Sequence, residues 1–293
     1  MLNFYVPPGI GDFSAMYCKL CNLDREMRII SSSESPQRLI PFLEILPNVK
    51  QSNYGPHGAD ASVNGTLSPG TDLASLPDGD YFLSINHWLE GGGKVKDWIP
   101  GETNYHYEMN NFQYAMQARR FLDSLETGAA IVGVYCSAFG NSRHWGFWDY
   151  TLWRKFLEKV ITVLPDNTHF LLIGAEYDLS ISDTLHGWMQ SIGKSSHLLL
   201  GEFHIGGTIE LIRQMDYLFS FPSGLGFLAD VVNTPHTMWF PGNLAPMMGT
   251  FTDPENYESQ RSYHATFNNP DGAFEQFKAV GLKFVEEACR SHS

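Results

Sequence analysis

The sequence predicts an α/β fold built on parallel sheets, and three observations support this class. Short apolar runs alternate with helical patterns over most of the 293 residues. Two of these runs, Ile131-Val132-Gly133-Val134-Tyr135 and Phe170-Leu171-Leu172-Ile173, are almost continuously hydrophobic, which is typical of strands buried on both faces of a parallel sheet. The alternation also restarts after Thr127-Gly128. The pattern therefore predicts two Rossmann-like, doubly wound domains.

The individual elements follow from these runs. We expect strands at residues 3–6, 27–31, 81–85, 130–136, 169–173, 197–200, 217–221 and 237–240. We expect helices around residues 12–22, 36–46, 106–125, 149–163, 207–214, 225–232 and 271–290. Residues 51–80 contain five glycines, three prolines and no Lys or Arg, and they are predicted to form a long irregular loop.

The restart of the pattern places the N-terminal domain at residues 1–126 and the C-terminal domain at residues 127–267. The last segment, residues 268–293, carries Phe274, Phe277, Phe284 and Ala288 on one helical stripe. An amphipathic terminal helix must pack on another element, and we expect this one to return to the first domain and complete it.

The composition limits the classes of partner. The formal net charge is −13 and the pI is about 5.2, whereas broad binding to nucleic-acid phosphates or to an anionic membrane needs clustered Lys and Arg. No apolar run reaches the roughly 18 residues of a membrane span, and residues 1–5 lack the charged start of a signal peptide. We therefore expect a cytoplasmic protein without integral membrane association.

The four cysteines are few and scattered, which fits a reducing compartment. Cys18 and Cys21 have the spacing of a redox pair, but a thioredoxin-type pair opens a helix and these two lie inside one. Buried helical thiols are the favoured interpretation.

The first motif that can carry chemistry is Pro8-Gly9-Ile10-Gly11-Asp12, which directly follows the first expected strand and opens a helix. Glycines at such a turn let backbone N–H groups approach a ligand, and a helix N-terminus favours an anion. Asp12 is expected at the carboxyl edge of the sheet. The alternative is an aspartate that only caps the helix. The turn is not a dinucleotide fingerprint, because the third glycine is missing.

The second motif is Ser223-Gly224-Leu225-Gly226, between the strand that ends at Phe221 and the next helix. The backbone amides of this turn are suited to cradling a pyrophosphate. A plain tight turn between strand and helix is an equally good interpretation.

Two further candidates follow the strands of the second domain. The stretch from Ser137 to Trp145 contains Arg143, whose guanidinium is suited to phosphate. Gly174-Ala175-Glu176 ends the next strand, where a carboxylate can accept hydrogen bonds from a ribose diol. A solvated loop arginine and a residue that merely starts a helix are the respective alternatives.

No metal or resident cofactor is predicted. Asp78-Gly79-Asp80 has the Asp-x-Asp spacing of metal-dependent transferases, but it follows Pro77 and precedes its strand, so a turn is the better interpretation. The histidines show neither His-x-His nor His-x-x-x-His spacing.

Taken in order, these motifs resemble glycosyltransferase family 9, the ADP-heptose:lipopolysaccharide heptosyltransferases and their relatives. Gly9-Ile10-Gly11-Asp12 matches the family's Gly-Asp turn, whose aspartate is the proposed catalytic base. Arg143 stands where a basic residue before Trp contacts the donor phosphates, and Glu176 stands where a glutamate holds the donor ribose. The match extends from Leu200 through the Ser223–Gly226 turn to Asn243.

The resemblance implies a GT-B fold, in which two Rossmann-like domains face a central cleft. It implies an inverting transfer from a nucleotide-sugar donor to an acceptor hydroxyl, with Asp12 as the base. Pro222 replaces the family's Asp and Phe227 replaces its His, and both replacements argue against heptose as the donor sugar.

The acceptor is then a hydroxyl of a glycan or lipopolysaccharide, or a hydroxymethylpyrimidine in DNA as in phage relatives of the family. The acidic charge speaks against the DNA acceptor. The alternatives are a nucleotide-sugar epimerase or hydrolase of the same fold, and a catalytically inactive nucleotide-sugar-binding protein.

Overall fold

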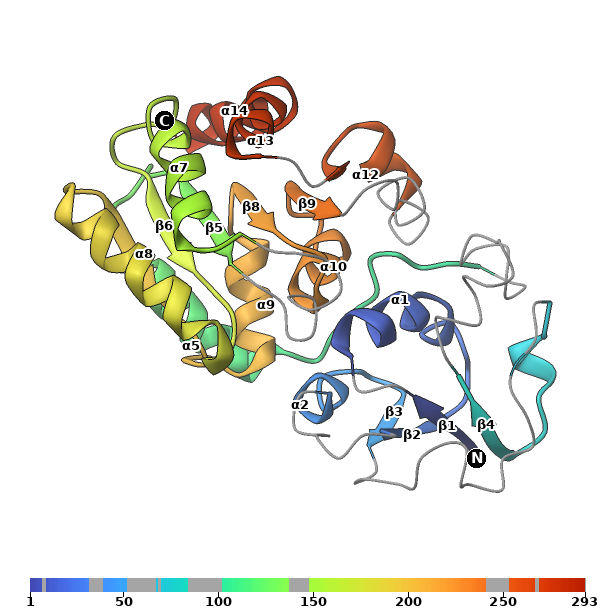
Figure 1. Ribbon diagram of the computed structural model, residues 1–293. Coiled ribbons are helices and arrows are strands. Elements are labelled where there is room, and N and C mark those ends of the chain that lie inside the picture. The colour runs from blue at the N-terminus through green and yellow to red at the C-terminus, as the bar shows by residue number, and fades with distance from the viewer. Residues whose placement is uncertain are drawn as a thin grey trace. The chain divides into compact units, whose positions relative to one another are not determined.

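The computed structural model consists of two α/β units, each built on a sheet of parallel strands (Figure 1). The structure describes residues 1–6, 9–31, 39–51, 67, 70–83, 102–136, 148–240, 253–266 and 269–292. The first unit is Met1–Asn111 and the second is Phe112–Ser293.

The first unit has a four-stranded sheet. Its elements are β1 (Leu2–Val6), α1 (Ile10–Leu20), β2 (Met27–Ser31), α2 (Ile40–Leu43), β3 (Val49–Gln51), the 3₁₀ helix η2 (Leu73–Ser75) and β4 (Gly79–Phe82). The strand order is β3-β2-β1-β4, and every pairing is parallel. Alternate residues of β1 and β2 are buried, as expected where one face of a pleated strand packs under helices.

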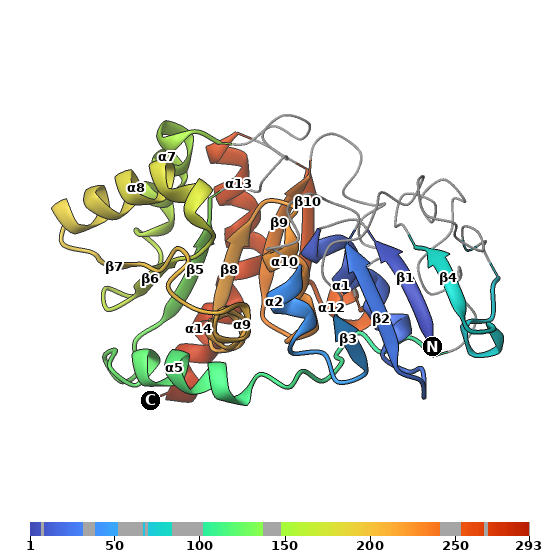
Figure 2. The same cartoon turned by 90° about the horizontal axis from the view of Figure 1, so that it is seen from below.

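The second unit has a six-stranded sheet, whose order is β10-β9-β8-β5-β6-β7 and whose pairings are all parallel. Figure 2 shows several of these strands side by side. In chain order the elements are α5 (Phe112–Leu122), β5 (Ile131–Tyr135), α7 (Tyr150–Val160), β6 (His169–Leu172), η3 (Glu176–Asp178), α8 (Leu179–Ser191), β7 (Ser195–Leu198), α9 (Ile205–Arg213), β8 (Tyr217–Ser220), α10 (Gly224–Val231), β9 (His236–Phe240), α12 (Pro254–Glu258), β10 (Ser262–Thr266), α13 (Pro270–Gln276), a π-helical turn (Phe277–Gly281) and α14 (Leu282–His292).

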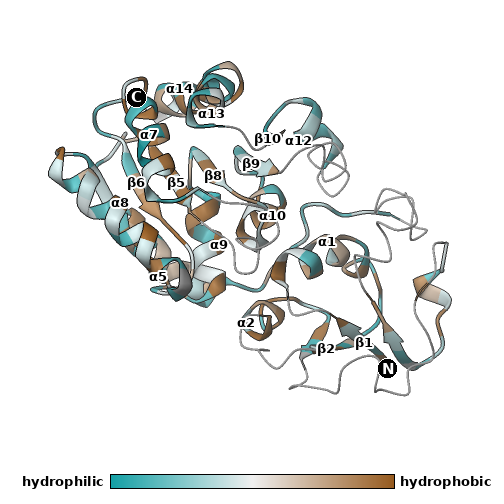
Figure 3. Ribbon diagram, in the orientation of Figure 1, coloured by the Kyte–Doolittle hydropathy of each residue, from teal (hydrophilic) through white to brown (hydrophobic). Residues whose placement is uncertain are grey.

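The core of the second unit is rich in aromatic side chains. β5 and β6 are strongly hydrophobic, whereas α7 and α8 are hydrophobic on one side only (Figure 3). Centroids of neighbouring rings in the aromatic cluster lie 5.0 to 6.1 Å apart, at separations typical of favourable aromatic pairs. The cluster consists of Trp148, Trp153, Phe156, Phe219, Phe221 and Trp239.

The boundary between the units lies between residues 111 and 112, not between 126 and 127. Helix α5 belongs to the second unit because it packs on α9. The Nε of Arg119 donates to the buried carboxylate of Glu210 at 2.7 Å. The ring of Tyr114 stacks on His204, with centroids 3.6 Å apart.

The destination of the C-terminal helix also differs from the expectation. The apolar stripe of this helix packs on other elements as expected, but it packs against the core of the second unit. Phe274, Phe277 and Val285 belong to that unit's core. At the π-helical turn Gly281 lies against Tyr217, so closely that a Cβ at Gly281 would stand 2.5 Å from the phenol oxygen. This segment therefore completes the second unit rather than the first.

Candidate functional site

Both sheets reverse their winding at a strand that is followed by a predicted motif. From β5 the chain winds outward to β6 and β7, and then returns to the other side of β5 for β8. In the first sheet the same reversal separates β1 from β4. Loops leave such a switch point in opposite directions, which makes the carboxyl edge of the sheet the usual ligand-binding position. Asp12 follows β1, Glu176 follows β6 and the Ser223–Gly226 turn follows β8.

Asp12 is the third residue of α1 and does not cap the helix through its side chain. Gly9 is the N-cap residue, and no side chain caps it. Asp12 is partly buried, and its carboxylate has no hydrogen-bond or ionic partner among the described residues. Burial raises the pKa of Asp12 from 3.8 to about 6, because removing water disfavours the charged form. This outweighs the lowering expected from the helix N-terminus.

The placement of Asp12 depends on Gly9. A Cβ at Gly9 would stand 2.9 Å from Oδ2 and 3.4 Å from Cγ of Asp12. The backbone of Gly9 is extended, with φ −77° and ψ 125°, so its dihedral angles do not require glycine. The glycine instead leaves the space that the carboxylate occupies. Gly11 lies in the first turn of α1, where backbone N–H groups lack helical partners.

Glu176 begins the 3₁₀ helix η3, at the end of the short turn that follows β6. Its side chain is exposed, and among the described residues its carboxylate has no hydrogen-bond partner. A free carboxylate at the carboxyl edge of the second strand of a doubly wound sheet can accept hydrogen bonds from a ribose diol.

The Ser223–Gly226 turn forms the N-terminus of α10. Ser223 is the N-cap residue, and its Oγ accepts the N–H of Gly226 at 3.3 Å. Within the described part of the chain, the N–H groups of Gly224 and Leu225 have no acceptor, so both remain available to a phosphate. Gly226 has a packing role, because a Cβ there would stand 2.6 Å from Sδ of Met238.

Two of the predicted site residues, Ser137 and Arg143, lie outside the described residues. The segment that contains them starts from Cys136, whose carbonyl accepts the indole N–H of Trp153 at 2.9 Å. It ends before Trp148, which is fully buried in the aromatic cluster.

Pro222 and Phe227, which replace the family's Asp and His, are both buried. They flank the turn that carries the free amides. The turn is therefore flanked by buried apolar side chains at the two positions where the family has Asp and His.

The sequence Asp78-Gly79-Asp80 lies at the amino end of β4, and both of its carboxylates are paired with other side chains. Asp78 forms an ion pair with Arg25 at 2.6 Å, and Oδ1 of Asp80 accepts the amide N–H of Asn3 at 2.7 Å. Over the residues that the structure describes, no group of three or more His, Cys, Asp or Glu side chains could hold a metal ion.

Burial raises the pKa of Cys21 to about 11, which leaves it an unreactive thiol.

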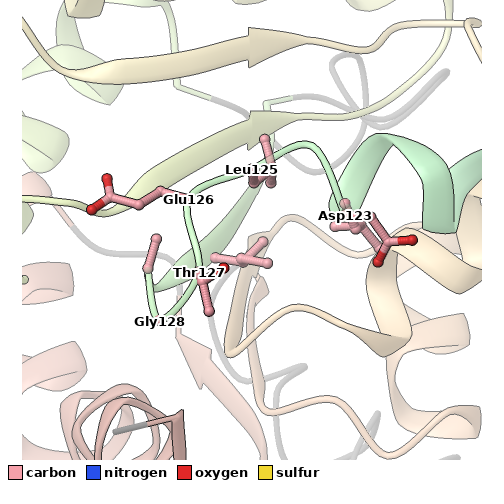
Figure 4. Close-up of a pocket in the computed structure, with 8 residues that line it drawn as sticks. Asp123, Leu125, Glu126, Thr127 and Gly128 are labelled. Carbon is pink, nitrogen blue, oxygen red and sulfur yellow. The ribbon is translucent and has the colours of Figure 1, made fainter.

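A cavity of about 360 Å³ lies at the connection between α5 and β5. Figure 4 shows the carboxylates of Asp123 and Glu126 turned away from each other, on opposite sides of this connection. The cavity adjoins Ile131, the first residue of β5. It therefore lies at the amino end of the strand, opposite the carboxyl edge of this sheet, where Glu176 and the Ser223–Gly226 turn lie. In the described ranges, no helix combines the length and apolarity needed to cross a bilayer.

Comparison with solved structures identifies the fold. The chain resembles ADP-heptose lipopolysaccharide heptosyltransferase II of E. coli, with a TM-score of 0.61 and 12% identity over 98% of this chain and 99% of that one. It resembles a family 9 glycosyl transferase from Veillonella parvula, with a TM-score of 0.54 and 11% identity over 98% and 97%. The UDP-GlcNAc 2-epimerase of Methanocaldococcus jannaschii gives a TM-score of 0.50 and 13% identity over 99% and 98%.

No family model matches the sequence, and no curated protein does. At these identities the likeness defines the fold alone. The fold is the GT-B fold of the two transferases, as the resemblance of the sequence to family 9 implies.

Proposed function

We propose that this chain is a metal-independent, inverting glycosyltransferase that uses a nucleotide-sugar donor. The observation that carries the proposal is the state of Asp12. Its carboxylate is partly buried and has no partner among the described residues, at the carboxyl edge of β1, and its pKa is about 6. A general base works best when its pKa lies near the working pH. The desolvated Asp12 meets this condition better than an ordinary aspartate with pKa 3.8.

In the proposed reaction Asp12 accepts the proton of an acceptor hydroxyl. The hydroxyl oxygen forms a bond to the anomeric carbon of the donor as the bond from that carbon to the diphosphate oxygen breaks. The electron pair of the broken bond leaves with the nucleoside diphosphate. Attack opposite the leaving group inverts the anomeric configuration.

The second unit holds the donor in this proposal. The free N–H groups of Gly224 and Leu225 bind the diphosphate and stabilise the charge that develops on it, together with Arg143 and Ser137. Glu176 accepts hydrogen bonds from the ribose. These groups take over the work that a metal ion performs in other transferases.

The chemical class of the substrates follows from the same site. A nucleotide-sugar donor is supported by the GT-B fold, and the apolar residues Pro222 and Phe227 argue against heptose. The acceptor is a hydroxyl of a glycan or lipopolysaccharide type, or of a hydroxymethylpyrimidine in DNA. The net charge of −13 favours the first class. A cytoplasmic location is supported by four cysteines that form no disulfide.

One second function has a specific observation in its favour. The fold is shared with a UDP-GlcNAc 2-epimerase, so a reaction on the nucleotide-sugar alone, by epimerisation or hydrolysis, is the rival. A catalytically inactive nucleotide-sugar-binding protein is the third candidate, and the replacements at Pro222 and Phe227 are its support.

The test is product analysis over a panel of nucleotide-sugars, with and without a mixture of hydroxyl acceptors. A transferase releases nucleoside diphosphate only when an acceptor is present. An epimerase or hydrolase changes the donor without an acceptor. An inactive binder shows a thermal shift with the donor and no product in either case. Release that does not depend on an acceptor contradicts the proposal.

A further inference from the structure

Two carboxylates in the turn after β6 have opposite environments. Glu176 is exposed and has no hydrogen-bond partner among the described residues, whereas Asp178, two residues later, is 1% exposed. The Oδ2 of Asp178 accepts the backbone N–H of Ala175 at 2.9 Å. The backbone N–H of Asp178 donates to the carbonyl of Ala175 at 2.8 Å. Asp178 therefore closes the turn on both sides of Glu176.

The backbone of the turn is shaped around the Asp178 carboxylate. Gly174 has φ +150°, in the region that favours glycine. A Cβ at Gly174 would collide with Oδ2 of Asp178 and would stand 3.1 Å from a methyl carbon of Leu200. The conformation of Gly174 and the side chain of Asp178 thus depend on each other.

The turn after β7 also lies beside Glu176. Gly201, after β7, donates its N–H to the carbonyl of Gly174 at 3.2 Å. A Cβ at Gly201 would stand 3.9 Å from Cγ of Glu176. The aliphatic part of Glu176 therefore lies next to the turn after β7, while its carboxylate stays free.

We propose that Asp178 is the positioning residue of the nucleotide-binding site: it holds the Gly174–Glu176 turn so that the Glu176 carboxylate meets the ribose hydroxyls of the donor. The inference rests on the proposed function. A buried carboxylate is costly unless hydrogen bonds satisfy it, and here the N–H that it accepts belongs to the residue before Glu176. Asp178 acts through Glu176 and does not itself contact the nucleotide.

The experiment measures ribose discrimination by calorimetric titration. ADP is compared with 2′-deoxy-ADP and UDP with 2′-deoxy-UDP, and the pair that binds more tightly is used for the variants. The parent should prefer the ribonucleotide by about 10-fold or more, the worth of a hydrogen bond to a charged acceptor. Glu176→Ala, which removes the acceptor, should bring this ratio close to one. Asp178→Ala should lower it at least threefold.

Three variants make the result specific to positioning. Asp178→Asn keeps an oxygen that can accept the Ala175 N–H, so it should restore the discrimination ratio. Asp183→Ala changes an exposed aspartate on α8, the helix that Asp178 precedes, and should leave the ratio unchanged. Asp178→Ser moves the oxygen that accepts the Ala175 N–H closer to the backbone. It is used in place of Asp178→Ala if thermal melting shows that the alanine variant does not fold. It too should lower the ratio.

An Asp178→Ala variant that weakens both nucleotides equally, with the ratio kept, overturns the positioning role and leaves the proposed function intact. The same holds if Asp178→Asn fails to restore the ratio. A parent that binds neither nucleotide pair, or does not discriminate between ribose and deoxyribose, refutes the assignment of Glu176 within the proposed function. The positioning role then fails with it.

Discussion

The carboxylate of Asp12 lies against the Cα of Gly9, where a Cβ would stand 2.9 Å from its Oδ2. Real Cβ contacts of this length are avoided, so alanine at position 9 must displace the carboxylate. The two residues belong to one motif in the sequence, and the structure gives that motif a steric meaning. The glycine makes room for the Asp12 carboxylate.

Gly9→Ala is therefore expected to reduce turnover at least 10-fold and to leave donor affinity nearly unchanged. The extended backbone at φ −77° accepts alanine, so the melting temperature should change little. Steady-state kinetics and thermal melting check this. Gly187→Ala is the control, because nothing lies near its Cβ in α8, and it should stabilise the chain by about 0.5–1 kcal/mol. Unchanged turnover in Gly9→Ala means that the position of Asp12 over Gly9 is not needed.

Gly226→Ala separates packing from ligand contact in the turn before α10. The new Cβ would stand 2.6 Å from Sδ of Met238 and 2.9 Å from Oγ of Ser220. Overpacking of this kind typically costs about 1–3 kcal/mol, measurable by urea denaturation. Adding Met238→Ala should give a total loss smaller than the sum of the two single losses, because the residues are in contact. A stable Gly226→Ala variant that no longer binds nucleoside diphosphate points instead to close approach of the ligand.

Removal of divalent metal should not affect donor binding. In the part of the chain that the structure describes, Asp78 and Asp80 are paired with Arg25 and Asn3 and do not form a metal site. Titration of a nucleoside diphosphate with and without EDTA checks this expectation. Loss of binding on chelation contradicts metal-independent catalysis.

Arg143→Ala should weaken binding of a nucleoside diphosphate far more than binding of the bare nucleoside. A charge-assisted hydrogen bond contributes about 1.5–3 kcal/mol, or roughly 10- to 150-fold in affinity. Parallel titrations of the two ligands measure the difference. Equal losses for both ligands point to a folding defect or a contact with the base.

Much of the fold is predictable because buried parallel strands are almost continuously apolar. The missing strands, β3 (Val49–Gln51) and β10 (Ser262–Thr266), lie at sheet edges and contain few apolar residues. Helix α8 is missing from the expectation because Ser, Asp, Thr and Gly187 give it a weak helical pattern. The boundary was misplaced because α5 is held by Glu210, which is 91 residues from Arg119.

The positions of the candidate motifs after their strands are predictable for a similar reason. Motifs that follow parallel strands lie at the carboxyl edge of their own sheet, so the sequence places Asp12 at that edge of the first sheet, and Glu176 and the Ser223–Gly226 turn at that edge of the second. It does not reveal that Gly226 packs on Met238, nor that Asp178 closes the turn that carries Glu176. Both depend on contacts made only after folding. The same is true of the desolvation that raises the pKa of Asp12.

Stability gives Asp12 a signature that is independent of turnover. The pKa of Asp12 in the folded state, about 6, lies above the ordinary value of 3.8. The folded state therefore binds the proton more tightly, and stability falls as the pH rises between these two values. Asp12→Asn cannot ionise at this position, so it does not lose stability in this way as the pH rises. At pH 8 it should melt higher than the parent, and the difference should disappear near pH 4. Equal melting temperatures at pH 8 contradict a desolvated carboxylate.

The pH dependence of turnover in the parent and in Asp12→Asn tests the central claim most directly. Asp12 must be ionised to act as the base, so parental turnover should rise with pH through about 6, the pKa of this carboxyl. Asp12→Asn should lose roughly 10²–10⁴-fold in turnover, lose the inflection near that pH, and bind the donor as tightly as the parent. An Asp12→Asn variant that retains more than about a tenth of parental turnover, with the same pH profile, contradicts the proposed mechanism.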